Sequence, residues 1–146
     1  MSAWPPLAEL LPQAGPMRLL ARVVEHTREE TRCELDVAAS ALFADEAGAV
    51  PSWVALEWMA QCAAVHGGLA ARVAGGLPAQ GMLVGARQLT LGRPSFGRGE
   101  QLTVSVRALG TAGALVTFAC EVRDAAGIVA SGSISVVTGT FSARAE

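Results

Sequence analysis

One carboxylate stands alone in the longest apolar stretch of the chain. The segment PSWVALEWMAQCAAVHGGLAA covers residues 51–71, and Glu57 is its one residue among Asp, Glu, Lys and Arg. Gln61 follows one helical turn later and would share a helix face with Glu57. Because a buried ionised carboxylate costs several kcal/mol unless it is paired, hydrogen-bonded or protonated, Glu57 either reaches solvent or a subunit seam, or belongs to a functional site.

The cysteines and histidines give no comparable indication of a functional site. Cys33, Cys62 and Cys120 each lie in an apolar element, and no two of them have the spacing of metal ligands. An odd cysteine number favours reduced, buried thiols in a cytoplasmic protein over a disulfide framework. His66 lies nine residues after Glu57, about half a helical revolution away, and would point elsewhere. We therefore expect no metal site.

Composition bounds the class of protein. The 146 residues are 51% hydrophobic and 16% charged, with a formal net charge of −2. These values indicate one folded domain over residues 1–146, and they argue against disorder and against nucleic-acid binding. The first residues lack the pattern of a signal peptide. Residues 47–71 are long enough to cross a membrane, but Pro51, Glu57, Gln61 and His66 interrupt them, so we expect no membrane span.

The order of elements follows from the hydrophobic pattern. Residues 17–27 and the alternating residues 30–38 predict a β-hairpin, and residues 39–50 form a looser stretch. A helix should begin at Pro51 with Ser52 as its N-cap, weaken at the glycine pair after His66, and end by residues 74–78. Strands should follow, the last three as an antiparallel meander, at residues 81–91, 101–109, 114–124 and 128–141.

A helix that is apolar almost all round must be covered on nearly every side. A single antiparallel sheet can do this by curling around the helix. The pattern therefore predicts an α+β domain in which a curved antiparallel sheet of about five to six strands wraps a long central helix. This arrangement is that of the hotdog fold.

Three segments, in order, resemble the hotdog 3-hydroxyacyl-ACP dehydratases of bacterial fatty acid synthesis. LLPQAGPMRLLARVVE (10–25) is similar to their early LPH-R-x-P-x-L-L-x-D-R-V segment, and GARQLTLGRPSFGRGEQL (85–102) to their later G-x-x-x-A-R-F…P-G-D-x-L segment. PSWVALEWMAQ (51–61) resembles their helix start, PGVLxxEAMAQ, and is the most specific match. The GPM triplet and Trp53 resemble more closely the small dehydratase-like hotdog proteins of aryl-polyene and related polyketide lipid systems.

The resemblance implies chemistry on acyl thioesters. In the dehydratases a histidine and the helix glutamate, brought together from two subunits, move the protons while water leaves a 3-hydroxyacyl thioester to give the trans-2-enoyl product. Carried over, Glu57 is the acid/base carboxylate and Gln61 its orienting neighbour, while the amides of Ser52 and Trp53 hold the thioester oxygen. The resemblance implies no cofactor beyond the phosphopantetheine of the substrate, carried by acyl carrier protein or CoA.

One departure from the family pattern is central. The family histidine, eight residues before the helix proline, corresponds to Phe43 here, and no histidine lies between Thr27 and Val65. Asp45 and Glu46 lie in the same loop and are candidate substitutes. Two arginines are candidate contacts for an acidic carrier protein or its phosphate, namely Arg87 and Arg93.

Three readings stay open. The chain is a dehydratase-like enzyme whose Glu57 works with a non-histidine partner, or with a histidine from another subunit. Alternatively, it is a hotdog thioesterase, in which Glu57 activates water or attacks the thioester. In the third reading it is a non-catalytic partner of a histidine-containing homologue. In each of them we expect a homodimer, or a heteromer with a related hotdog subunit, paired sheet edge to sheet edge.

Overall fold

The computed structural model describes residues 4–76 and 80–139. One long α-helix, α1, covers Ala55–Val73 and is preceded by a short 3-10 helix, η4 (Ser52–Val54). Three further 3-10 helices are η1 (Leu7–Glu9), η2 (Gly15–Met17) and η3 (Val37–Phe43). The strands are β1 (Arg22–His26), β2 (Glu30–Asp36), β3 (Val50–Pro51), β4 (Gln80–Leu91), β5 (Ser95–Phe96), β6 (Gln101–Ala112), β7 (Leu115–Asp124) and β8 (Gly127–Gly139).

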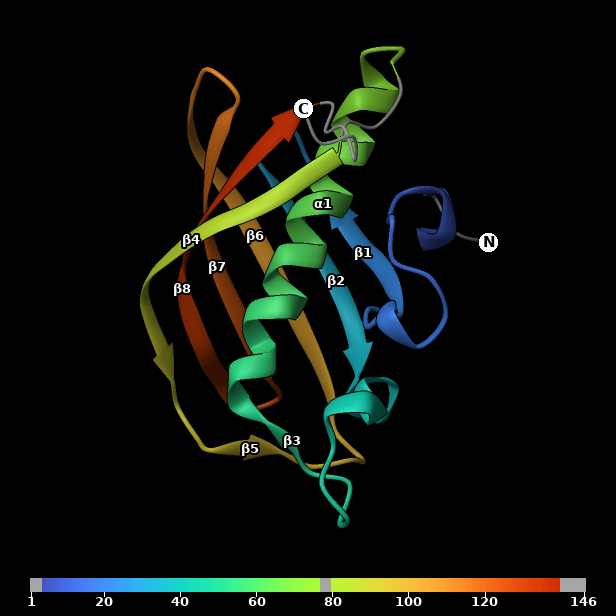
Figure 1. Ribbon diagram of the computed structural model, residues 1–146, viewed down its shortest axis with the longest axis vertical. Helices are drawn as coiled ribbons and strands as arrows, with labels where there is room; N and C mark the ends of the chain where they lie inside the picture. The colour runs from blue at the N-terminus through green and yellow to red at the C-terminus, as the bar shows by residue number, and fades with distance from the viewer. Residues whose placement is uncertain (1–3, 77–79, 140–146) are drawn as a thin grey trace, which may run out of the picture.

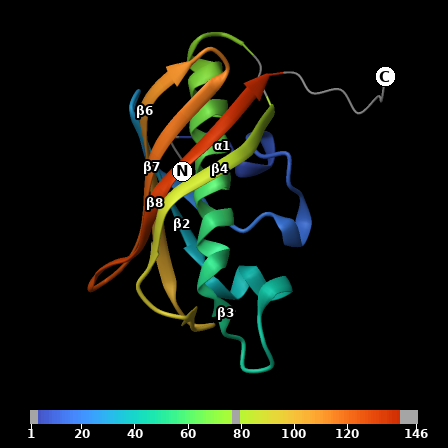
Figure 2. The same cartoon turned by 60° about the vertical axis from the view of Figure 1, so that its left-hand side comes forward.

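Six strands form one antiparallel sheet in the order β1-β2-β6-β7-β8-β4. The sheet curls around α1, which runs along its inner face (Figures 1 and 2). Strands β6, β7 and β8 form the predicted meander, and β1 pairs with β2 as the predicted hairpin. A second, two-stranded ladder joins β3 to β5 beside the start of α1. This is the hotdog architecture expected from the sequence.

The helix supplies much of the core. Its fully buried side chains include Trp58, Met59, Cys62 and Val65, which belong to one hydrophobic cluster with inward residues of the strands. β2 shows how the sheet contributes, since its residues alternate between buried and half-buried along its whole length. Fully burying one side chain of this size contributes about 1.5–3 kcal/mol. Burial on nearly every side is what allows so apolar a helix in a single domain.

Both ends of α1 differ from the simplest expectation. Ser52 lies in η4, and its side chain makes no capping hydrogen bond, so the predicted N-cap is wrong. The helix also continues through Gly67 and Gly68, where the sequence predicted that it would weaken. Glycine at position 68 leaves room for Leu10, whose Cδ2 would lie only 3.2 Å from a Cβ there. It ends where Gly75 adopts a positive φ and the Gly76 N–H bonds the Ala71 carbonyl.

The segment before β1 contacts the helix, and β1 itself pairs with the sheet. The strand predicted over residues 17–27 begins only at Arg22, because Met17 and Leu19 bond to a helix side chain instead. Leu19 is fully buried, so its apolar character reflects helix packing and not strand pairing. Residues 77–79 and 140–146 lie outside the described residues, as do the parts of the predictions that fall on them.

Over the described ranges, none of the helices is long and apolar enough to span a membrane. Cys33, Cys62 and Cys120 are free thiols and all are buried, as predicted. Burial raises the pKa of the Cys120 thiol to about 12 and the pKa of Cys62 well above its ordinary value, with Cys33 next to it as a further cause. A thiol held in its neutral form is a poor nucleophile, so Cys62 and Cys120 serve the core.

Candidate active site

Glu57 and Gln61 lie together, one turn apart on α1. Gln61 Nε2 donates to Glu57 Oε1 at 3.1 Å and also to the Met17 carbonyl at 2.8 Å, and Gln61 Oε1 accepts from the Leu19 N–H at 3.0 Å. The Gln61 side chain is fully buried, whereas Glu57 is half-buried at the surface of the helix. The glutamine therefore ties the carboxylate to the backbone of the N-terminal segment.

The backbone partners decide which way the Gln61 amide points. The Leu19 N–H can only donate and the Met17 carbonyl can only accept, so the Gln61 oxygen must face Leu19 and its nitrogen Met17. The second hydrogen on that nitrogen is then directed at Glu57 Oε1. Because Oε1 is held as an acceptor, a proton carried by Glu57 belongs on Oε2. The hydrogen bond from Gln61 thus distinguishes the two oxygens of the carboxyl group.

The start of the helix carries the two backbone amides predicted to hold the thioester oxygen, those of Ser52 and Trp53. The first N–H groups of a helix have no acceptor within it, and the Ser52 N–H is taken up by the Pro94 carbonyl at 3.0 Å. The Trp53 N–H is the next donor along the chain, in the first turn of η4. The Trp53 side chain is 56% exposed and packs edge-on against Phe43 with ring centroids 5.8 Å apart. Of the two predicted amides, that of Ser52 is therefore engaged within the protein.

The loop in which the family histidine is missing contains Phe43, Asp45 and Glu46. Phe43, at that position, packs on Trp53. Asp45 Oδ1 accepts the N–H groups of Ala47 and Ala49, both at 2.9 Å, and so closes its own turn. Asp45 and Glu46 line a separate surface hollow of about 260 Å³ together with Arg98. The structure brings Glu57 and Gln61 together but gives neither loop acid a contact with Glu57 within the described residues.

Both histidines lie on another side of α1. His66 Nδ1 and His26 Nδ1 each lie 2.7 Å from the Thr31 hydroxyl, and the two ring centroids are 5.2 Å apart. Thr31 is fully buried on the inner face of β2. Burial lowers the pKa of His66, with His26 adding to the effect, and burial lowers the pKa of His26. His66 thus points away from Glu57, as the helical spacing predicted.

The two arginines predicted to contact a carrier differ in their surroundings. Arg87 is exposed on β4, at the edge of the sheet. Arg93 is held within the protein, because its guanidinium pairs with Glu100 at 2.5 Å and lies 3.9 Å from Asp124 Oδ2. Of the two arginines, Arg87 is the exposed one.

Sequence reasoning missed the backbone partners of the site. Met17 and Leu19 contact Gln61 through main-chain atoms, and the family resemblance covers these positions without indicating that role. Thr31 was likewise missed as the bridge between two histidines. Three apolar side chains come from elements around the start of α1 and are notably exposed, namely Met17 (42%), Leu42 (58%) and Trp53 (56%).

Comparisons with known proteins agree with this architecture. The fold is similar to the dehydratase heterocomplex ApeI:P from Xenorhabdus doucetiae, with TM-score 0.89, 24% identity, and 94% of this chain and 93% of that chain covered. It is also similar to the phenylacetic acid degradation protein PaaI from Thermus thermophilus (TM-score 0.60, 16% identity, coverage 80% and 90%). A hypothetical thioesterase with coenzyme A from Streptococcus pneumoniae has TM-score 0.57 and 11% identity, with coverage of 83% and 88%.

At these identities the structural likeness shows the fold. None of the curated proteins matches the chain. The family model described as ApeP dehydratase (ApeP-like) matches residues 5–145, which include the helix with Glu57 and Gln61 and both flanking segments of the resemblance. The predicted kinship with the dehydratase-like hotdog proteins of aryl-polyene systems is thereby confirmed. The chain belongs to the ApeP-like dehydratase family.

Proposed function

We propose that this chain is the glutamate-bearing subunit of a 3-hydroxyacyl-thioester dehydratase, and that a related hotdog subunit supplies the histidine. The observation that carries this proposal is the Glu57–Gln61 arrangement, in which the carboxyl group is half-buried and one of its oxygens is committed to a donor. A solvated surface glutamate needs no hydrogen bond that fixes its orientation. A carboxyl group that must deliver a proton in one direction does need one.

The chemistry follows from this geometry. The partner's histidine removes a proton from C2 of the acyl chain, and electrons move toward the thioester carbonyl, whose oxygen is met by the Trp53 N–H at the start of the helix. Protonated Glu57 gives the proton on Oε2 to the C3 hydroxyl, which leaves as water. The C2–C3 double bond of the enoyl thioester remains, and the proton taken from C2 restores Glu57 through solvent.

The need for a second subunit rests on what surrounds Glu57. Within the described residues both histidines bond to Thr31, and Phe43 occupies the place of the family histidine. The dehydratase ApeI:P is a heterocomplex, and an arrangement of that kind would give Glu57 its missing base. We therefore favour a heteromer over a homodimer for the active form.

The surface offers two apolar areas for such a partner. Met17, Leu42 and Trp53 are exposed next to the start of α1. Strand β4 ends the sheet and leaves one backbone edge open, with Met82 52% exposed and Val84 52% exposed along it. A long apolar edge strand is a template for pairing with another chain. Pairing of two related subunits along β4 would cover the second area.

The test is mass spectrometry of an acyl carrier protein loaded with a 3-hydroxyacyl chain. The carrier is incubated with this protein alone, with a histidine-containing dehydratase-like subunit from the same genome, and with both. We expect loss of water, about 18 Da, when both are present and little or none with this protein alone. A CoA thioester of the same chain, run in parallel, distinguishes the two carriers.

Three results would contradict the proposal in different ways. Dehydration by this protein alone would show that its own residues supply the base, and Asp45 and Glu46 would be replaced next. Release of the free acid would identify a thioesterase. Full activity of the mixture when Glu57→Gln replaces the wild-type chain would leave this chain a non-catalytic partner.

A further inference from the structure

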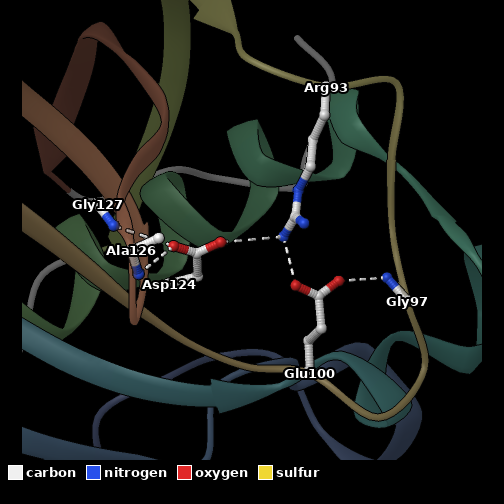
Figure 3. Close-up of polar contacts among 6 residues, drawn as sticks. All are labelled: Arg93, Gly97, Glu100, Asp124, Ala126 and Gly127. Atoms are coloured by element: carbon white, nitrogen blue, oxygen red, sulfur yellow. Dashed lines mark hydrogen bonds and ion pairs between the residues drawn. The ribbon is translucent and has the colours of Figure 1, made fainter.

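The Arg93 side chain interacts with three groups, although the proposed site chemistry does not use it. Its guanidinium reaches Glu100 at 2.5 Å, lies 3.9 Å from Asp124 Oδ2, and stands over the Phe96 ring at 4.8 Å from the centroid. Figure 3 shows the arginine between the two carboxylates, which come from different turns of the sheet. Arg93 and Glu100 are each only 31% exposed. An arginine placed in this way is unsuited to reach out for a carrier protein.

Both carboxylates also hold backbone groups. Glu100 Oε2 accepts the Gly97 N–H at 2.6 Å, and Asp124 Oδ1 accepts the N–H groups of Ala126 and Gly127 at 2.7 and 3.0 Å (Figure 3). Arg93 therefore connects the 92–100 segment with the turn between β7 and β8. Charge-assisted hydrogen bonds of this kind are roughly twice as strong as neutral ones.

The 92–100 segment in turn fixes the start of the helix. Its β5 residues pair with β3, so that Val50 faces Phe96 and Pro51 faces Ser95. The Pro94 carbonyl then accepts the Ser52 N–H. The backbone of residues 50–54, which leads into α1, is thus held by the segment that Arg93 closes.

A second connection runs through the aromatic rings. Phe96 is fully buried and packs on Trp58 with centroids 5.1 Å apart, and Trp58 follows Glu57 directly on α1. Trp58 Nε1 also donates to Ser40 Oγ at 3.0 Å, which joins η3 to the same cluster. The Arg93 guanidinium is therefore connected through Phe96 and Trp58 to the helix turn that carries Glu57.

We propose that Arg93 is a positioning residue: its pair with Glu100 closes the 92–100 segment, which holds the start of α1 through the β3–β5 ladder, and so sets the Trp53 N–H relative to Glu57. This rests on the function proposed above, in which that amide and that carboxyl group act on the same thioester. It replaces the carrier-binding role that the sequence suggested for Arg93. Because catalysis depends on orientation, small displacements of such donors cost large factors in rate.

Hydrogen exchange tests the lock without any assay of activity. The Ser52 amide is the reporter, since its acceptor belongs to the 92–100 segment. In Arg93→Gln we expect exchange of this amide to quicken about tenfold or more, with amides at the centre of β6 and β7 unchanged. Arg93→Lys, which keeps the charge but loses the planar fork, should lie between.

Two further variants complete the design. Glu100→Gln removes the charge pair from the other side while its amide oxygen still accepts from Gly97, and it should quicken the Ser52 exchange as Arg93→Gln does. It also serves if Arg93→Gln does not fold. Arg123→Gln breaks the exposed pair with Glu121 on β7 and is the matched control, with exchange of Ser52 unchanged.

Kinetics in the assembly that dehydrates add the readout of position. We expect Arg93→Gln to lower kcat about tenfold with little change in KM for the loaded carrier, and Arg93→Lys to recover part of it. A raised KM at constant kcat, with Ser52 exchange as in the wild type, would establish carrier binding and overturn the inference. Unchanged exchange in both Arg93→Gln and Glu100→Gln overturns it even if no assembly turns over, so its failure is distinct from that of the proposed function.

Discussion

The same helix carries two polar clusters that differ in what they leave open. Around Glu57, the Gln61 amide uses all its hydrogen-bonding groups on the backbone and on one carboxylate oxygen, and the other oxygen lies at a half-buried surface. Around His66, the buried hydroxyl of Thr31 binds two imidazoles, the buried ring of His66 and the half-buried ring of His26. The first cluster presents a group, whereas the second closes on itself.

The comparison teaches how one apolar helix tolerates ionisable residues. A buried polar group costs free energy when it is unpaired and little when it is satisfied. The His66 cluster meets this condition within the chain, because Thr31 partners both rings. Glu57 meets it only in part, and the remaining oxygen is what a substrate or a partner subunit would use.

The largest effect should come from Glu57→Gln. If Glu57 delivers the proton, turnover in the assembly with the histidine-containing subunit should fall by about 10²–10⁴-fold, the usual contribution of general acid catalysis. Thermal unfolding should stay near that of the wild type, because the side chain is only half-buried. Turnover within twofold of the wild type would remove Glu57 from the mechanism.

Gln61→Leu removes the hydrogen bond from the Gln61 amide to Glu57 Oε1. It leaves the Leu19 N–H and the Met17 carbonyl without their partner, at a cost to the free energy of unfolding of about 3 kcal/mol. Urea denaturation measures this cost. Gln101→Leu, which removes an exposed hydrogen bond to Asp36, is the matched control and should stay within about 0.5 kcal/mol of the wild type. Equal losses in the two variants would mean that Gln61 holds nothing.

Thr31→Val tests whether the histidine cluster acts independently of Glu57. The change keeps the shape of the side chain but removes the hydroxyl between the imidazoles, and should lower the free energy of unfolding by about 1–2 kcal/mol. Turnover of the folded protein should not change, since Glu57 lies on another side of the helix. A loss of turnover larger than the loss of folded protein would connect the histidines to the site.

The smallest effect concerns pH. Burial lowers the pKa of His66 and of His26 from the ordinary 6.5, so the unfolded chain binds protons more readily than the folded one. Stability should therefore be complete above about pH 6.5 and decline as the pH falls below it. Glu29 and the Arg28 carbonyl act on His66 in the opposite direction and temper the decline.

The measurement is the midpoint of urea unfolding between pH 7.5 and 5.5. In His66→Gln the midpoint should depend less on pH than in the wild type, because one of the two groups with a lowered pKa is gone. A midpoint that rises as the pH falls through this range in the wild-type protein would contradict the sign.

Much of the fold followed from local pattern. The alternation along residues 30–38 and 101–109 specifies strands with one buried face, and the run around Trp58 specifies a covered helix. The positions where prediction failed are those where long-range contacts decide. Residues 17–21 were predicted as strand because Leu19 and Leu20 are apolar, but the backbones of Met17 and Leu19 bond to Gln61 of the helix. Ser52 has the chemistry of an N-cap, but lies in a 3-10 turn whose N–H bonds Pro94.

The sequence by itself determined which residue supplies the carboxyl group of the candidate site and which class of protein the chain resembles. A lone Glu57 followed by Met59, Ala60 and Gln61 on an apolar helix is a local feature, and spacing along a helix decides which residues share a face. The same spacing predicted that His66 points away from it. These properties depend only on residues close together in the chain.

Only the tertiary structure decided how that group is held. Gln61 bonds residues more than 40 positions earlier, and Arg93 bonds a turn 31 positions later. Such contacts form when the sheet closes around α1, and no local pattern encodes which backbone atom will face which side chain. The orientation of the Glu57 carboxyl group and the commitment of Arg93 are therefore properties of the closed fold, because hydrogen-bond partners are chosen by geometry in space and not by distance along the chain.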